Sequence, residues 1–526
     1  MPSGVRPGFL RIRFGRSFNM NNAVQVSNEE IYRSILDEFI KINRCPRAYG
    51  HMEYISPYLY QWGLDHGFET VRDEAGNVRW DVPATKGYEA SPRCILQAHM
   101  DLVPVSDDGR DLAVSPVTVV EDTEKGIVSS DGHTSLGADD GIGVAIAMYL
   151  SVSDAFPHGP LRVICTVNEE GGSPSGTGGM DPAWVQDGEY MVNIDTEDYG
   201  ICTVACCGSA GYTFDIPLQS KASDEGKAAY VIELDGLLGG HSGVEIEKNR
   251  ASAIKAVNYI LAYAEYRGID MEIASFTGGT GYTAIPRKAK AVVVIPESRA
   301  ELFEKGAEQA IRYFAKQFDR TEKGYTFTCV KTALPERVLT SDCSAKIIGI
   351  IAASEDGLHT VSQRYRGVTE SSFNMGTLDI ASDMERASVT VIMRINSAWP
   401  CMLAHMQFRA IAKAFGVTLN PGAAPDAFDP DKIYSGWSGK ETDTISAIYS
   451  RAFREYTGED CVVSAVHGGL ECAAFAAMNP DLQIIAVGPT IENPHSVTEH
   501  VVMKTIPTTC GAIGTFLSYI AAGIRK

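Results

Sequence analysis

The chain has 526 residues, of which 44% are hydrophobic and 21% are charged, and its formal net charge is −20. This length exceeds what one hydrophobic core supports, so we expect two or more domains of an ordinary globular protein. The acidic balance argues against nucleic acid or an anionic membrane as a partner. No apolar run reaches the roughly 18 residues that would predict a membrane span.

The first twenty residues contain no acid and four arginines, Arg6, Arg11, Arg13 and Arg16. An organelle-targeting segment and an upstream-extended start both fit this pattern. The extended start is favoured, and we expect residues 1–25 to be disordered.

The twelve cysteines form no C-x-x-C pair. Their closest group is Cys202, Cys206 and Cys207, for which small buried hydrophobic side chains are a simpler interpretation than a redox or metal site. This usage predicts a reducing, cytoplasmic location.

Helix and hairpin signals open the compact part of the chain. Ser27 and Glu30 have the spacing of a capping box, which predicts a helix start. A second helix is expected near 55–66. Residues 68–72 and 77–81 are typical of a hairpin around an intervening turn.

A buried strand over 93–98 runs into His99 and Asp101. Side chains two apart on extended backbone point to the same side, so His99 can bind a metal while Asp101 orients its imidazole from behind. A strand that ends in a solvated His and Asp is the alternative.

More acidic side chains follow buried segments. Asp139 precedes a helix expected over 142–151 and could be an N-cap, a metal ligand or both. A strand over 161–167 leads to Glu169 and Glu170, which point to opposite sides, and a strand over 190–194 leads to Asp195. Open α/β sheets place ligands at such carboxyl ends.

The pattern changes after residue 208 and returns near residue 435. Between them, helices and antiparallel strands predict an inserted α+β lid domain made of two halves in series. We therefore expect a disordered segment 1–25, a discontinuous catalytic domain with a mostly parallel sheet at 26–207 and 431–526, and a lid at 208–430. A buried strand over 482–487 precedes the loop that contains His495.

Five candidate ligands result: His99, Asp139, Glu170, Asp195 and His495. They can serve two zinc ions if Asp139 bridges, with His99 and Asp195 on one ion and Glu170 and His495 on the other. Two such ions acidify a shared water and polarise a carbonyl together.

The chain resembles the co-catalytic zinc metallopeptidases related to aminoacylase and carboxypeptidase G, and within them the aminoacyl-histidine dipeptidases. The matching stretches follow that family's order: 73–78, 96–101, 136–143, 168–172, 193–198, 239–243, 284–289, 467–472 and the 488–495 loop.

The resemblance implies roles for further residues. The five ligands match the family's positions, Asp101 matches the carboxylate behind the metal site, and Glu169 matches the general base. His241 matches a lid histidine that helps hold the oxyanion. Arg394 matches a lid arginine that grips the substrate carboxylate, although an exposed strand-end arginine is the plainer interpretation.

Two positions depart from the family pattern. Thr283 stands where Asn is usual, which puts a substrate or oxyanion contact in doubt. Gly468 stands where Ala is common and could shift substrate preference, and His467 is expected to shape the pocket beside it.

The implied activity is metal-dependent hydrolysis of dipeptides with a free C-terminal carboxylate, Xaa-His dipeptides among them. Two divalent ions are expected, zinc first, with cobalt or manganese as alternatives. The expected partners are small dipeptides, without nucleic acid or membrane, and the chain could form a homodimer. An N-acyl amino acid deacylase, a tripeptidase and an inactive binding homologue are the alternatives.

Overall fold

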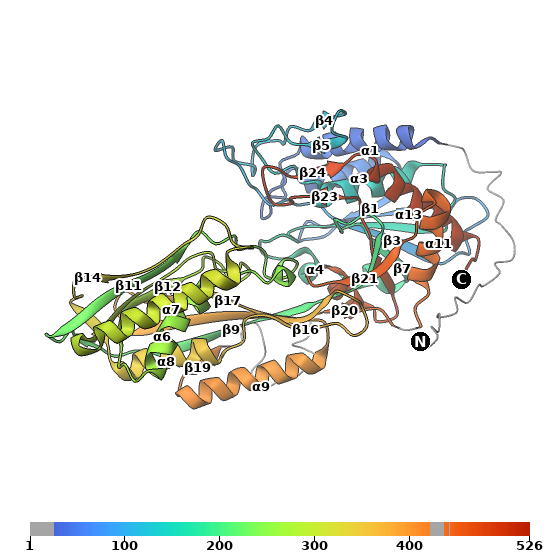
Figure 1. Ribbon diagram of the computed structural model, residues 1–526. Coiled ribbons are helices and arrows are strands. Elements are labelled where there is room, and N and C mark those ends of the chain that lie inside the picture. Colours follow the sequence, from blue (N-terminus) through green and yellow to red (C-terminus); the bar gives the residue numbers. More distant parts are fainter. Residues whose placement is uncertain (1–25, 421–435, 441, 526) are drawn as a thin grey trace, which may run out of the picture.

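The computed structural model describes residues 26–420, 436–440 and 442–525. Two bodies lie next to each other (Figure 1): the first contains both the early and the late residues of the chain, and the second contains the middle. The segment 1–25, for which disorder was expected, lies outside the described residues, as does the predicted boundary at 430.

A nine-stranded sheet forms the centre of the first body. Its middle strands β6, β3, β7 and β22 run parallel, whereas β1, β2, β8 and β20 join it by antiparallel pairs and β21 pairs with β8 in parallel. The strands in spatial order are β1 (Glu69–Arg72), β2 (Val78–Val82), β6 (Leu161–Thr166), β3 (Arg93–His99), β7 (Gly188–Asn193), β22 (Gln483–Ala486), β8 (Ile201–Cys206) and β20 (Trp437–Ser438), with β21 (Val462–Val466) also pairing β8.

Helices cover both faces of this sheet, because successive strand residues point to opposite sides. Leu96 of β3 packs in one hydrophobic cluster and its neighbour Ile95 in another. The larger cluster includes residues of α1 (Asn28–Asn43), α2 (Ile55–Asp65), α3 (Ala138–Val152), α11 (Ile445–Thr457) and α13 (Thr505–Ala521). The smaller cluster includes residues of α5 (Ala183–Gln186) and α12 (Cys472–Met478), and the short α4 (Gly176–Gly179) lies beside α12. The predicted capping box of α1 is confirmed, with Ser27 and Glu30 hydrogen-bonded to each other's backbone.

A small antiparallel sheet ties the late part of the chain to the early part. Its order is β23 (Ile491–Glu492), β24 (His500–Val502), β5 (Ile127–Ser129) and β4 (Val120–Asp122). The loop that contains His495 lies between β23 and β24, so this sheet fixes both ends of that loop.

The second body is built on an antiparallel nine-stranded sheet and one shared core. Its strands are β14 (Thr326–Thr332), β11 (Lys227–Asp235), β13 (Ala289–Pro296), β12 (Glu272–Gly278), β17 (Thr369–Ile380), β18 (Arg386–Ile395), β9 (Gly208–Pro217) and β19 (Thr418–Asn420), with β16 (Gly357–Val361) paired to β17. A separate two-stranded sheet joins β10 (Ser220–Ala222) and β15 (Arg337–Leu339). The helical elements are η1 (Ile246–Lys248), α6 (Ala253–Tyr266), η2 (Glu297–Arg299), α7 (Ala300–Phe318), α8 (Ser341–Ala353) and α9 (Ala398–Phe415).

The expected α/β class, with a discontinuous first body and a sheet that is parallel at its centre, is confirmed. The expected boundaries and the division of the lid into two halves stay predictions. Strands β8 and β20 were not predicted, because β8 is buried at five successive positions and so lacks alternation, and β20 has only two residues.

The first body also holds a buried ion pair at Arg162, and this pair gives a prediction about stability. Its Nε lies 2.7 Å from Asp81 Oδ1 and its Nη1 lies 2.6 Å from Asp187 Oδ1. Arg93 also pairs with Asp81 at 3.0 Å and with Asp187 at 2.9 Å, so both carboxylates keep one cation when Arg162 is replaced. The loss of the charge-assisted hydrogen bonds of Arg162 should therefore cost about 2 kcal/mol of unfolding free energy in Arg162→Met. Urea unfolding followed by tryptophan fluorescence measures the loss.

The matched control is Lys305→Met, which removes an ion pair with Glu301 whose side chains are 70% and 82% exposed. Its expected cost is below about 1 kcal/mol, because water screens exposed pairs. Equal losses in the two variants would contradict the prediction.

Candidate metal centre

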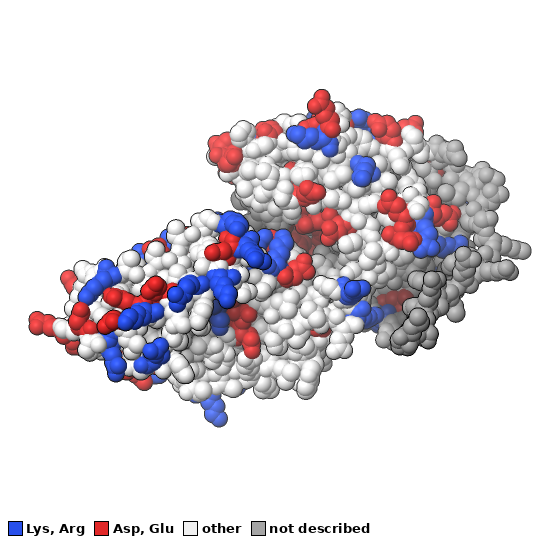
Figure 2. Space-filling view, in the orientation of Figure 1, with Lys and Arg blue, Asp and Glu red and all other residues white. Residues whose placement is uncertain are grey.

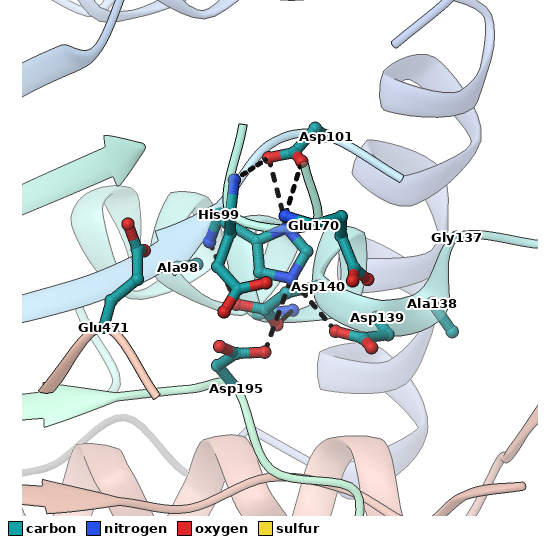
Figure 3. Close-up of polar contacts among 12 residues, drawn as sticks. Ala98, His99, Asp101, Gly137, Ala138, Asp139, Asp140, Glu170, Asp195 and Glu471 are labelled. Atoms are coloured by element: carbon teal, nitrogen blue, oxygen red, sulfur yellow. Dashed lines mark hydrogen bonds and ion pairs between the residues drawn. The ribbon is translucent and has the colours of Figure 1, made fainter. Parts of the chain in front are cut away.

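The candidate ligands converge at the carboxyl edge of the parallel strands. His99 ends β3, Glu170 follows β6, and Asp195 follows β7. Asp139 and Asp140 have non-helical backbone at the start of α3. The Asp140 side chain, and not that of Asp139, accepts the backbone N–H of Gly143 at 3.1 Å, so Asp140 takes the capping position. Figure 3 shows the side chains of His99, Asp139, Glu170 and Asp195 gathered in one place.

The imidazole of His99 faces two carboxylates. Its Nε2 lies 3.0 Å from Asp139 Oδ1 and 3.5 Å from Asp195 Oδ1. His99 is 1% exposed and Asp101 behind it is fully buried, so the alternative of a solvated strand end is wrong.

The imidazole of His495 faces the other side of Asp139. Its Nε2 lies 3.3 Å from Asp139 Oδ2 and 2.6 Å from Glu170 Oε1. The two oxygens of Asp139 therefore point to two different histidines, as a carboxylate shared by two ions must. Ligand atoms of His99, Asp139 and Glu170 all lie within 4.8 Å of one another.

Burial and crowding change the protonation of these groups. Burial raises the pKa of Asp195 to about 7 and the pKa of Glu169 well above its usual range. Burial opposes charge on His495, but hydrogen bonds to Asp139 and Glu170 raise its pKa to about 11. Buried carboxylates need a compensating cation, and this set of oxygen and nitrogen donors suits divalent metal ions. The residues present therefore fit a metal centre.

Asp101 holds the segment that follows β6. Its Oδ1 accepts the backbone N–H of Glu169 and its Oδ2 accepts that of Glu170, both at 3.1 Å. Its distance to His99 Nδ1 is 3.5 Å, and that nitrogen has no hydrogen-bond partner among the described residues. Orientation of His99 by Asp101 stays a prediction, and the structure adds positioning of the two glutamates.

A layer of polar side chains lies one step below the ligands on the same strands. Gln97 precedes His99 by two residues and Asn193 precedes Asp195 by two, so each pair shares a face. Asn193 Nδ2 donates to Gln97 Oε1 at 2.6 Å, and Gln97 Nε2 donates to Glu471 at 2.7 Å. These residues were not predicted, although their two-residue spacing from the ligands is a signal in the sequence.

The predicted lid residues come together in the second body. Arg394, near the end of β18, is 7% exposed, so the alternative of a solvated strand-end arginine is wrong. Its Nη2 lies 3.1 Å from His241 Nε2. Thr283 lies beside this pair, with its carbonyl accepting the backbone N–H of Ser242 at 2.9 Å.

The second body also meets the loop that contains His467 and Gly468. A Cβ on Gly243, two residues after His241, would lie 2.6 Å from the His467 carbonyl oxygen. His467 Nε2 lies 2.7 Å from Ser372 Oγ, which fits its expected place in the pocket wall. Figure 2 shows a hollow between the two bodies, with Asp and Glu side chains visible inside it.

Both ring nitrogens of His241 face hydrogen-bond donors, although a neutral imidazole can accept at only one nitrogen. Its Nδ1 faces the backbone N–H groups of Gly243 and Val244 at 3.3 Å, while its Nε2 faces Arg394, which also donates. Burial, together with Arg394, lowers the pKa of His241 to about 4, so the ring is neutral at pH 7 and has one acceptor nitrogen. A carboxylate or oxyanion beside Nε2 removes the conflict.

The chain belongs to peptidase family M20/M25/M40, whose model matches residues 95–518. It is 27% identical to the cytosol non-specific dipeptidase of Escherichia coli K12 over 490 residues, covering 93% of this chain and 96% of that protein. The structure is similar to that of aminoacylhistidine dipeptidase from Vibrio alginolyticus, with a TM-score of 0.77, 25% identity, and coverage of 95% and 98% of the two chains. An aminopeptidase from Bacillus cereus shares the fold, with a TM-score of 0.52, 16% identity, and coverage of 93% and 99%.

These comparisons confirm the resemblance that the motifs gave, and with it a metallopeptidase fold and peptidase class. Among the described residues, no helix is long and apolar enough to cross a membrane. The individual roles of the ligands, of Asp101, Glu169 and His241, and of Arg394, Thr283 and Gly468 stay predictions.

The two adjacent glutamates should respond differently to removal of their charge. Glu169→Gln should retain metal and lose about 100- to 10,000-fold in kcat, because only a proton carrier is removed. Glu170→Gln should lose metal, because the Glu170 carboxylate oxygen lies 2.6 Å from His495 Nε2, close enough for both atoms to bind one ion. Elemental analysis and kcat measure both effects. Metal loss in the Glu169 variant together with full occupancy in the Glu170 variant would reverse the assignment.

Proposed function

We propose that this protein hydrolyses dipeptides with a free C-terminal carboxylate, Xaa-His dipeptides among them, in a reaction that depends on two divalent metal ions. The observation that carries the proposal is that the two carboxylate oxygens of Asp139 face two different histidines, His99 and His495. Glu170 Oε1 lies 2.6 Å from His495 Nε2, so Glu170 and His495 can bind the same ion. Two relatives that each match more than nine tenths of this chain are named as dipeptidases, which supports the substrate class.

The proposed metal set is His99, Asp195, Glu170 and His495, with Asp139 shared. Bound there, two divalent ions would acidify water and polarise the scissile carbonyl. We propose zinc as the native metal, since carboxylate and imidazole are ligands that zinc accepts.

Glu169 is the proposed proton carrier. It follows β6 directly, its backbone is held by Asp101, and the charges of His99 and Asp195 act on its carboxyl group. A carboxylate whose pKa is raised above its usual range can take a proton from water and return it to the leaving amine.

Arg394 and His241 form the proposed carboxylate site. Arg394 is buried, and its Nε has no hydrogen-bond partner among the described residues. A carboxylate placed there accepts from the guanidinium and from His241 Nε2, which resolves the conflict between donors. A site that binds the terminal carboxylate close to the metals accommodates a dipeptide in preference to a longer chain.

Small dipeptides are the proposed partners, and the name of the Escherichia coli relative supports a cytoplasmic location for this protein. No feature of the described residues favours a deacylase, a tripeptidase or an inactive homologue. The homodimer stays a prediction.

Metal removal tests the proposed function. Protein freed of divalent ions by a chelator should not hydrolyse carnosine or Gly-His, and about two equivalents of zinc, cobalt or manganese should restore hydrolysis. Histidine release and metal content are measured together on a panel of dipeptides, tripeptides and N-acetyl amino acids. Full activity without divalent metal, or hydrolysis of acetyl amino acids in place of dipeptides, would overturn the proposal.

A comparison of two substrates tests the carboxylate site. Arg394→Ala should weaken use of a free dipeptide, with a loss in log kcat/KM equivalent to about 2–5 kcal/mol. The dipeptide amide lacks the charge and should be a poor substrate of the parent, but it should lose little more in the variant. Lys288→Ala, an exposed basic residue of the same body that pairs with Asp235, is the control and should leave both substrates unchanged. Equal losses on acid and amide in Arg394→Ala would make that residue structural.

A further inference from the structure

We infer that Glu499 is a positioning residue for the metal centre, which fixes where the Asp139 carboxylate stands between the two histidines. The inference rests on the proposed metal site. It concerns a residue four positions after His495 that is 2% exposed and has no place among the proposed ligands. Its side chain is directed at the backbone that leads into α3.

Glu499 accepts four consecutive backbone N–H groups. Its Oε2 accepts from Leu136 at 2.9 Å and from Gly137 at 3.0 Å. Its Oε1 accepts from Ala138 at 2.7 Å and lies 3.4 Å from the backbone nitrogen of Asp139. These groups lead into α3, whose backbone is non-helical at Asp139 and Asp140, so their N–H groups precede the regular helix and lack intrahelical partners. The carboxylate thus satisfies several donors and sets the path of the backbone at Asp139.

Arg47 holds the same segment through its carbonyl groups. This arginine is 1% exposed, and its Nη2 donates to the Gly137 carbonyl at 2.5 Å. Its Nη1 donates to the carbonyls of Met100 at 3.2 Å and Asp101 at 3.1 Å, just beyond His99. A Cβ on Gly137 would lie 2.4 Å from Arg47 Nη2, so the backbone fits between the two side chains without room to spare. Opposite charges on the two side chains hold this segment in one position.

The position of Glu499 in the chain couples the two halves of the metal site. It lies between the His495 loop and β24, so the element that delivers His495 also fixes the segment that delivers Asp139. A shift of Glu499 moves both ligands relative to His99, although its carboxylate serves backbone groups and no ligand side chain. Mutation of a residue that holds metal ligands in position typically lowers metal affinity or activity by about 10- to 100-fold.

Glu499→Gln tests the inference directly. A glutamine amide has one oxygen and one NH₂ group, so its NH₂ must face backbone N–H donors. We expect this variant to bind the weaker of its two Co²⁺ ions about 10- to 100-fold less tightly than the parent, with an altered visible spectrum of the bound cobalt. The kcat for Gly-His should fall by a similar factor while KM stays near the parent value.

Glu322→Gln is the matched control for burial and lost backbone bonds. Glu322 is 1% exposed and accepts the backbone N–H groups of Leu238 at 2.8 Å and Ala251 at 3.1 Å, in the second body. It should lose thermal stability as Glu499→Gln does but bind Co²⁺ as the parent does. Glu499→Asp, which keeps the charge on a shorter side chain, serves if the Gln variant does not fold, with a smaller loss of affinity expected.

The outcomes separate the two proposals. A parent that does not bind two ions overturns the proposed function, and the inference with it. A parent that binds two ions, with a folded Glu499 variant of unchanged cobalt affinity, spectrum and kcat, overturns the inference alone. Equal loss of cobalt affinity in the Glu322 and Glu499 variants also overturns it, because stability and not position would then govern metal binding.

Discussion

The repulsion between buried carboxylates is the constraint on which the first body depends. The side chains of Asp139, Glu170 and Asp195 are 8–12% exposed and lie at one edge of a sheet, together with the buried imidazole of His99 and the more exposed imidazole of His495. Such a cluster is unstable unless cations offset its charge, so fold and cofactor requirement have one origin. The surrounding chain holds the cluster in place through the carboxylates of Asp101 and Glu499, which accept backbone N–H groups beside the ligands.

Parallel strand pairing turns that constraint into a defined geometry. Because β3, β6 and β7 run in register, residues beyond their ends reach the same edge. The residues two positions earlier form a hydrogen-bonded layer that includes Gln97 and Asn193. The second body adds a buried arginine and a neutral histidine with opposed donors. One side of the hollow is therefore anionic without metal, and the other side has donors that lack an acceptor.

Short-range patterns in the sequence predicted much of this site. His99, Glu170 and Asp195 each follow a buried apolar run, so their common location followed from strand direction alone. Arg394, in contrast, has the sequence context of any strand end, and only its burial distinguishes it. Glu499 was beyond prediction for a different reason: its partners are backbone groups some 360 positions away, and backbone amides leave no mark in a sequence. Similarly, β20 and β23 are two-residue strands that only tertiary pairing defines.

The discontinuity of the first body has a consequence for biosynthesis. Strand β22 lies between β7 and β8 in the sheet, yet almost 280 residues of chain separate it from β8. A ribosome that has completed the whole second body has still not produced β22, the His495 loop or α13. Until the final tenth of the chain emerges, residues 26–207 therefore lack the strand that completes their sheet and lack the ligand His495. Since the second body has its own core, it can fold while the first body is still incomplete.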